Sequence, residues 1–149
     1  MLPFQWRNFG QASSFHGPVV TLKTFEDNGL VRTTLEKDGQ GRVLLVDGGG
    51  SLRCALVGDQ IAALAAKNGW AGVVVHGAVR DADTIDAECS VSIKALGTSP
   101  VKSVRRGWGA LDVPVTLGQQ GGIMIRTGDY VYADADGVLI AKKPLHLKK

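Results

Sequence analysis

The sequence predicts a mixed, layered α/β domain, and three observations support this fold class. Two apolar runs typical of buried strands, 43–46 and 73–75, flank a stretch with helical spacing at 58–69. A strand, a helix and a strand in this order indicate a parallel βαβ unit with a right-handed crossover. Beyond residue 90 the apolar runs are short and separated by polar turns, so the second half is expected to be almost entirely β.

The helix of the βαβ unit carries the main geometric expectation. Ile61, Leu64 and Ala65 share one face, and Asn68-Gly69 is a good C-terminal stop. Two starts are open: a fresh N-terminus at Gly58 after a short turn at 52–55, or one continuous helix from Ser51. The periodicity does not decide between them. A fresh start would leave the N–H groups from Gly58 onward free to bind a carboxylate or phosphate.

The remaining elements follow from local patterns. Asp27 is the expected N-cap of a short helix at 25–35, and Pro114 favours an edge position for its strand. Asp83 and Asp86 are expected in a loop after the βαβ unit. The other expected strands are 18–24, 91–96, 113–117, 123–125, 130–133 and 138–141, with a turn at 38–41 and a hairpin turn at Asp136-Gly137.

Composition sets bounds on the function. The 149 residues predict a single domain, 1–149. Four of the 17 basic residues lie in a tail at 142–149, and without them 13 basic residues face 14 acidic ones. The body is therefore near neutral, which argues against direct nucleic-acid binding. Cys54 and Cys89 have no metal-type spacing and suggest free thiols in a reducing cytoplasm, and no apolar run is long enough to span a membrane.

Charged side chains follow the two strands of the βαβ unit. Arg80 and Asp81 come after the second strand, Asp59 lies twenty-two residues before Asp81, and a glycine run at 48–50 follows the first strand. Both strands should end at the same edge of the sheet, where open α/β layers bind ligands. We therefore expect a site there for a small anion and a hard metal ion. Without further information, a structural ion pair between Arg80 and Asp81 is the default alternative.

Other polar residues near the predicted site have simpler interpretations. Asp47 is expected to close a strand as a turn residue rather than to bind metal. His76 is expected to pack beside the site rather than to act as a base. Asp134 and Asp136 are expected in a turn, because the glutamate that a calcium loop needs is absent.

Several long motifs resemble one known family, that of the regulator of ribonuclease activity A, which includes the class II 4-hydroxy-4-methyl-2-oxoglutarate aldolases. The resemblance extends from about Asn8 to Ala141. The segments that carry it are Phe25-Glu26-Asp27-Asn28-Gly29, Val46 to Arg53, Ala55 to Gln60, Lys67 to Asp81, Gly128-Asp129-Tyr130 and Tyr132 to Val138. Members with aldolase activity carry an aspartate, twenty residues and then Arg-Asp, a pattern present here as Asp59 and Arg80-Asp81.

The resemblance implies a swivelling β/β/α domain, usually assembled as a homotrimer. It implies that Asp81 binds a divalent cation, Mg²⁺ or Mn²⁺, and that Arg80 binds the pyruvyl group. It also implies that Asp59 holds a metal-bound water and that backbone amides bind the substrate, those of Gly58, Asp59, Gln60 and Ile61.

The activity that the resemblance implies is cleavage of 4-hydroxy-4-methyl-2-oxoglutarate to pyruvate. Cleavage leaves a pyruvate enolate, which a divalent cation stabilises as a Lewis acid. The same enolate forms when oxaloacetate loses carbon dioxide, so oxaloacetate decarboxylation is an expected side activity. The alternative is a protein-binding inhibitor of a ribonuclease E-type endonuclease, without catalysis.

Overall fold

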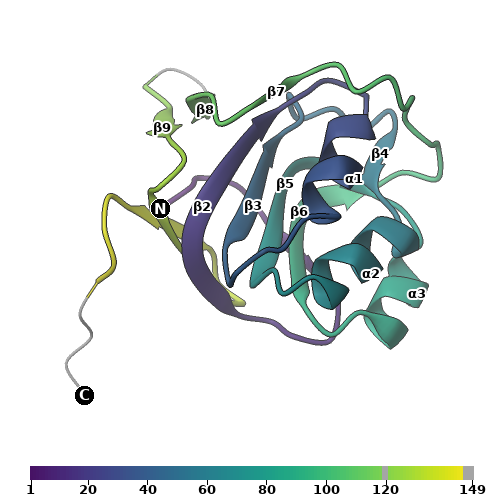
Figure 1. The fold of residues 1–149 in the computed structure, drawn as a ribbon, viewed down its shortest axis with the longest axis horizontal. Coiled ribbons are helices and arrows are strands. Elements are labelled where there is room, and N and C mark those ends of the chain that lie inside the picture. The colour runs from purple at the N-terminus through teal and green to yellow at the C-terminus, as the bar shows by residue number, and fades with distance from the viewer. Residues whose placement is uncertain (119–120, 146–149) are drawn as a thin grey trace.

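The computed structural model describes residues 1–118 and 121–145, and its main feature is a curved mixed sheet (Figure 1). The strands follow the order β1-β6-β5-β3-β2-β10-β11, while β4 pairs with β5, β7 pairs with β2, and β8 pairs with β9 alone. The helices are α1 (Gly29–Leu35), α2 (Asp59–Lys67) and α3 (Ala82–Glu88). The strands are β1 (Arg7–Phe9), β2 (Phe15–Lys23), β3 (Val43–Asp47), β4 (Ala55–Val57), β5 (Gly72–Val79), β6 (Ser92–Thr98), β7 (Ala110–Leu111), β8 (Val115–Leu117), β9 (Ile123–Ile125), β10 (Tyr130–Ala133) and β11 (Val138–Ala141).

The predicted βαβ unit is present, with β3 and β5 parallel and α2 between them in the chain. Val43 pairs with Gly72, and Asp47 pairs with His76. Strands β2 and β6 extend the parallel part on either side. Together with β4, which is parallel to β5, five strands therefore point their carboxyl ends toward one edge of the sheet, which we call the carboxyl edge.

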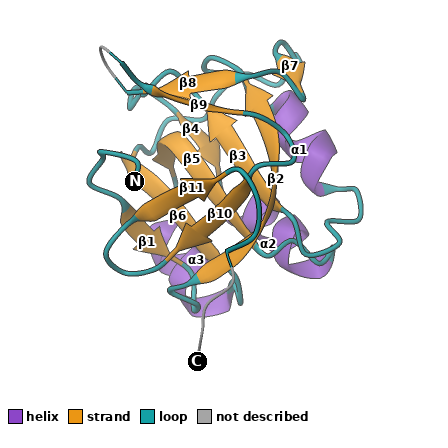
Figure 2. Ribbon diagram, turned by 90° about the vertical axis from the view of Figure 1, so that its left-hand side faces the viewer, coloured by secondary structure: helices purple, strands orange, loops and turns teal. Residues whose placement is uncertain are grey.

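The sheet separates two apolar cores. All three helices cover one face (Figure 1), where Leu44 and Val46 of β3 join the helix-side core. Val43 and Leu45 point into an outer core, which is covered by the β8–β9 pair and by β10 and β11 (Figure 2). A strand buried on both faces is apolar at every position, which explains the unbroken run at 43–46. The result is a β/β/α layering, and the predicted mixed α/β fold class is confirmed.

Two helical predictions at the carboxyl edge are settled. The fresh helix start is confirmed, because α2 begins at Asp59 with Gly58 as its extended N-cap. The continuous helix from Ser51 is wrong. The chain bends at 53–54 within the predicted turn at 52–55, but β4 begins at Ala55, the last residue of that range, and Ala55 and Val57 pair with β5.

Two predictions about local structure are wrong. The helix predicted at 25–35 begins at Gly29, and its N-cap is Asn28 rather than Asp27. Glu26 has a left-handed backbone with φ of 55°, which is incompatible with a helix there. The loop expected around Asp83 and Asp86 is instead helix α3. Its single buried residue, Ile85, gave too weak an apolar period to be recognised.

Two further observations complete the comparison with the predicted elements. The turn at Asp136-Gly137 is confirmed, and it joins β10 to β11. Strands β1 and β7 were not predicted. No helix in 1–118 or 121–145 is long and apolar enough to cross a membrane.

Candidate active site

The candidate site lies at the carboxyl edge, where β4 and β5 end beside each other. The N–H of Arg80 donates to the carbonyl of Val57 at 2.9 Å, which places the residue after β5 next to the last residue of β4. Gly58 then occupies the N-cap position of α2, and Asp81 occupies that of α3. The topology therefore brings together Gly58, Asp59, Arg80 and Asp81, as the sequence predicted.

Arg80 and Asp81 form a close pair above Gly58. Nη1 of Arg80 lies 2.9 Å from Oδ2 of Asp81, and the backbone N–H of Asp59 lies 3.3 Å from the same oxygen. A Cβ atom on Gly58 would lie 2.9 Å from Cζ of Arg80 and 3.0 Å from Oδ2 of Asp81. Only glycine leaves room for the guanidinium and the carboxylate to approach the chain this closely.

Asp81 has an unusual backbone conformation. Its φ of 60° and ψ of 40° are left-handed, a region that non-glycine residues visit rarely and aspartate more than most. This conformation turns the chain sharply from β5 into α3. Such backbone outliers cluster at functional sites, because the surrounding structure must hold them in place.

The first turn of α2 supplies N–H groups to the same place. Gly58 has no side chain that could cap the helix, and the Asp59 N–H already faces the Asp81 carboxylate. The next two N–H groups, of Gln60 and Ile61, belong to the helix end, where no intrahelical acceptor exists. They are available to an anion at the positive end of the helix dipole.

The residues present fit a divalent metal held mainly by water. No group of three or more His, Cys, Asp or Glu side chains with metal-site geometry occurs within the part of the chain that the structure describes. Mg²⁺ needs only one or two protein carboxylates and keeps several waters. The Asp81 side chain is one-third exposed, and both of its protein contacts go to Oδ2. Oδ1 of Asp81 is therefore available as a metal ligand.

Asp47 and His76 lie apart from this pair, on the outer-core face of the sheet. Nδ1 of His76 is 3.6 Å from Oδ1 of Asp47, too far for a hydrogen bond, and the imidazole packs against Phe4. The Gly49 N–H donates to the same carboxylate oxygen at 3.0 Å. Burial raises the pKa of Asp47, but the His76 ring and the Gly49 N–H outweigh burial and hold the pKa below its ordinary value. These contacts agree with the packing and turn interpretations.

A segment at 99–109, which no sequence pattern predicted, crosses the carboxyl edge. Its backbone bonds successively to Val79, Ala55 and Asn28. The buried Asp27 carboxylate fixes its far end by accepting N–H groups from Arg106, Gly107 and Trp108 as well as from Gly29. Burial opposes ionisation of Asp27, yet these four bonds keep its pKa below the ordinary value. A lone aspartate before a helix carries no signal of such distant partners.

Exposed apolar side chains lie on the loops that follow β2, β3 and β6 at the carboxyl edge. Arg53 stacks on Phe25 and makes a bidentate ion pair with Glu26, whose pKa the hydrogen bonds from Arg53 and Ser51 lower. The exposed residues, which we call the edge patch, are Phe25, Leu52, Val101, Val104 and Trp108.

Comparison with known proteins decides the family. The model of the family described as Aldolase/RraA matches residues 3–140. The chain belongs to the Aldolase/RraA family. Relatives in this family include a protein of Arabidopsis thaliana named "Putative 4-hydroxy-4-methyl-2-oxoglutarate aldolase 3", which is 54% identical over 92% of this chain and 80% of the relative.

Two further family members show how widely the similarity extends. A protein of Burkholderia mallei (strain SAVP1), named "Putative 4-hydroxy-4-methyl-2-oxoglutarate aldolase", is 58% identical over 94% of this chain and 82% of its own length. A solved structure, described as that of the RNA-processing inhibitor RraA from "Thermus thermophilis", is 46% identical with a TM-score of 0.89, and the match covers 95% of this chain and 84% of that one. Aldolase/RraA proteins similar to this chain thus carry names for both an enzyme and an inhibitor.

Proposed function

We propose that this Aldolase/RraA protein is a divalent-metal-dependent aldolase that cleaves 4-hydroxy-4-methyl-2-oxoglutarate into two molecules of pyruvate. The observation that carries the proposal is the arrangement around Gly58. A guanidinium, a carboxylate with a free oxygen and the N-terminus of α2 meet within contact distance of one glycine. The names of the aldolase relatives support the choice of substrate.

Each site residue has a role in this reaction. The substrate 1-carboxylate accepts hydrogen bonds from the N–H groups at the start of α2, while Arg80 binds the adjacent oxo group through its planar fork. Asp59, acting through a water molecule, removes the proton of the 4-hydroxyl. The C3–C4 bond then breaks, C4 becomes the carbonyl carbon of one pyruvate, and the bond's electrons form the enolate of the other. Protonation at C3 completes the second pyruvate.

Asp81 would hold the metal ion, Mg²⁺ or Mn²⁺, through its free carboxylate oxygen. When bound, the ion supplies Lewis-acid stabilisation of the negative charge that develops on the enolate. Arg80 contributes to the same stabilisation from a position fixed by its 2.9 Å bond to Asp81. Oxaloacetate yields the same enolate when it loses carbon dioxide, so we propose oxaloacetate decarboxylation as a second activity of the site.

A direct test is pyruvate release, measured with and without a chelator. Asp81→Asn should lower kcat/KM at least about a hundredfold, because the amide is a poor ligand for a hard cation. Asp83→Asn, an exposed change two residues further along, is the matched control and should retain activity. Undiminished turnover in excess chelator, or in Asp81→Asn, would refute metal-dependent cleavage.

We also propose a homotrimer. The edge patch supports it, because five large apolar side chains exposed on the loops of one edge are typical of an interface that a partner covers. A closed threefold ring would bury this surface against a different surface of the neighbouring subunit. Sedimentation at micromolar concentration should give three times the chain mass, and Trp108→Asp together with Val104→Asp should give the monomer. A wild-type chain that stays monomeric would refute the assembly.

The second candidate function is inhibition of a ribonuclease E-type endonuclease by direct protein contact. The similarity to a structure described as an RNA-processing inhibitor favours it. An inhibition assay with wild type and Asp81→Asn separates the two functions. Inhibition that persists in Asp81→Asn, in a chain without aldolase activity, would support the regulator. Aldolase activity without any inhibition would exclude it.

A further inference from the structure

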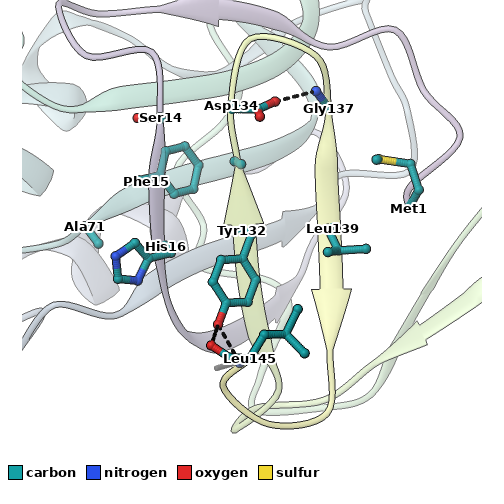
Figure 3. A pocket seen from close by; sticks show the side chains of 11 residues that line it. Met1, Ser14, Phe15, His16, Ala71, Tyr132, Asp134, Gly137, Leu139 and Leu145 are labelled. Carbon is teal, nitrogen blue, oxygen red and sulfur yellow. Dashed lines mark hydrogen bonds between the residues drawn. The ribbon is translucent and has the colours of Figure 1, made fainter. Parts of the chain in front are cut away.

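Figure 3 shows a cavity that is lined by residues of β2, β10 and β11 and lies away from the candidate active site. Its volume is about 700 Å³, and it is bordered by β2, β10 and β11. Phe15, in its wall, packs against Gly72 at the first position of β5, whereas Arg80 follows the last position of that strand. At about 3.3 Å per residue, the two sites lie on the order of 20 Å apart. The cavity is therefore separate from the proposed catalytic chemistry.

One wall of the cavity is flat and aromatic. His16, Tyr132 and Leu139 are cross-strand neighbours on the outward face of β2, β10 and β11. The outward face of an antiparallel sheet usually carries polar residues, but here it carries rings and an aliphatic side chain. The His16 and Tyr132 rings lie 5.8 Å apart at an interplanar angle of 22°. The Tyr132 hydroxyl accepts the Leu145 N–H at 2.6 Å, which fixes the ring (Figure 3).

The cavity also contains a fixed negative charge. Oδ1 of Asp134 accepts the N–H groups of Asp136 at 2.8 Å and Gly137 at 3.2 Å, so the turn between β10 and β11 holds the carboxylate in place. Among the described residues that line the cavity, Asp134 is the only carboxylate, and none is a lysine or arginine. Lys94 lies in the outer core, 2% exposed, with its ammonium bonded to the Ser13 carbonyl. Burial lowers the pKa of this ammonium, and the nearby Asp134 carboxylate partly opposes that lowering.

We propose that this cavity binds a small aromatic molecule that carries a cationic amine. The volume lies within the range of about 300–1,000 Å³ that is common for small-molecule sites. The His16 and Tyr132 rings, 22° from parallel, provide a stacking surface for a flat ligand ring, and Met1 and Leu139 add apolar lining. The Asp134 carboxylate gives the site its charge preference, because a cationic amine neutralises it where an anion would be repelled.

The test compares two probes with the same ring and opposite charge, tryptamine and indole-3-acetate. We expect tryptamine to bind saturably at pH 7, at least ten times more tightly than indole-3-acetate. Binding should shift the backbone amide resonances of Ala133, Asp134 and Gly137 in an NMR titration and leave those of Arg80 and Asp81 unchanged. Equal affinity for the two probes, or shifts confined to the carboxyl edge, would overturn the proposal.

Variants separate the charge from the stacking surface. Asp134→Asn retains the oxygen that accepts the two turn N–H groups and removes only the charge, so it should weaken tryptamine binding at least tenfold. Asp136→Asn, on the same turn but outside the cavity, is the matched control and should change nothing. Tyr132→Leu should weaken both probes. The inference would be overturned if tryptamine did not saturate the wild type. The same holds if binding fails because a second copy of the chain covers the cavity.

Discussion

The most direct test of the proposed site is Gly58→Ala, because the added methyl group would contact the side chains of both Arg80 and Asp81. The added Cβ would lie 2.9 Å from Cζ of Arg80, so the guanidinium must retreat by about 0.5 Å to reach the 3.4 Å at which ordinary contact begins. Oδ2 of Asp81, 3.0 Å from the Cβ, must move as well. A misplacement of about 1 Å commonly costs on the order of a hundredfold in rate. We therefore expect kcat/KM to fall about 10- to 100-fold, or roughly 1.4–2.7 kcal/mol.

The same change should hardly affect stability. Gly58 has φ of −112° and ψ of −169°, an extended conformation that alanine adopts without strain. Alanine is a poorer N-cap than glycine, but it also restricts the unfolded chain, and the two effects nearly cancel to within about 1 kcal/mol.

The assay for Gly58→Ala is steady-state pyruvate release, with chemical denaturation to check the fold. Gly97→Ala, in β6, is the control, because its Cβ would find only Leu52 at an ordinary 3.7 Å. Wild-type kcat/KM in folded Gly58→Ala would refute the close packing around Gly58 as a requirement for activity.

Three further predictions concern Arg80, Asp27 and Lys94. Arg80→Lys keeps the charge but loses the planar fork, so KM should rise, kcat should fall, and the loss in kcat/KM should correspond to about 2–4 kcal/mol. Product inhibition by pyruvate should also be weaker. Unchanged kinetics would show that Arg80 is only an ion-pair partner. Asp27→Asn should cost about 2–3 kcal/mol in urea denaturation, since an amide cannot accept all four N–H groups. The pKa of Asp27 is lowered in the folded protein, so the ionised carboxylate stabilises the fold above about pH 4. This stabilisation is lost as the pH falls through the lowered pKa. Asp27→Asn should not show this loss. Lys94→Met should stabilise the protein by about 1–2 kcal/mol at pH 7, because it removes a buried charge. Burial lowers the pKa of Lys94 from 10.5, so wild-type stability should rise as pH increases toward that value, and an identical rise in the methionine variant would contradict this assignment.

The sequence predicted those parts of the fold that depend on local periodicity. The runs at 43–46 and 73–75 identified β3 and β5, and the parallel βαβ rule then placed Gly58, Asp59, Arg80 and Asp81 at one edge. That inference needed no knowledge of distant contacts. The proximity of these residues was therefore predictable, although the left-handed backbone of Asp81 was not.

The parts that were missed depend on partners far away in the chain. Asp27 resembles a helix cap in sequence, but most of its hydrogen bonds go to residues about eighty positions later. Helix α3 buries only Ile85, so its amphipathic pattern was too weak to detect. The cavity depends on a pairing between β2 and β10 that no local pattern indicates.

Strand β2 has a consequence for the order in which the chain can fold during synthesis. Val19–Lys23 pairs with β3, about twenty-five residues later, whereas Phe15–Pro18 pairs with β10, more than a hundred residues later. A nascent chain that ends before Tyr130 can complete the helix-covered half but leaves one end of β2 as an open strand edge. Because closing such a long loop is slow, the final hairpin should dock last, and the ribosome-bound intermediate should be the species most exposed to aggregation and chaperone capture.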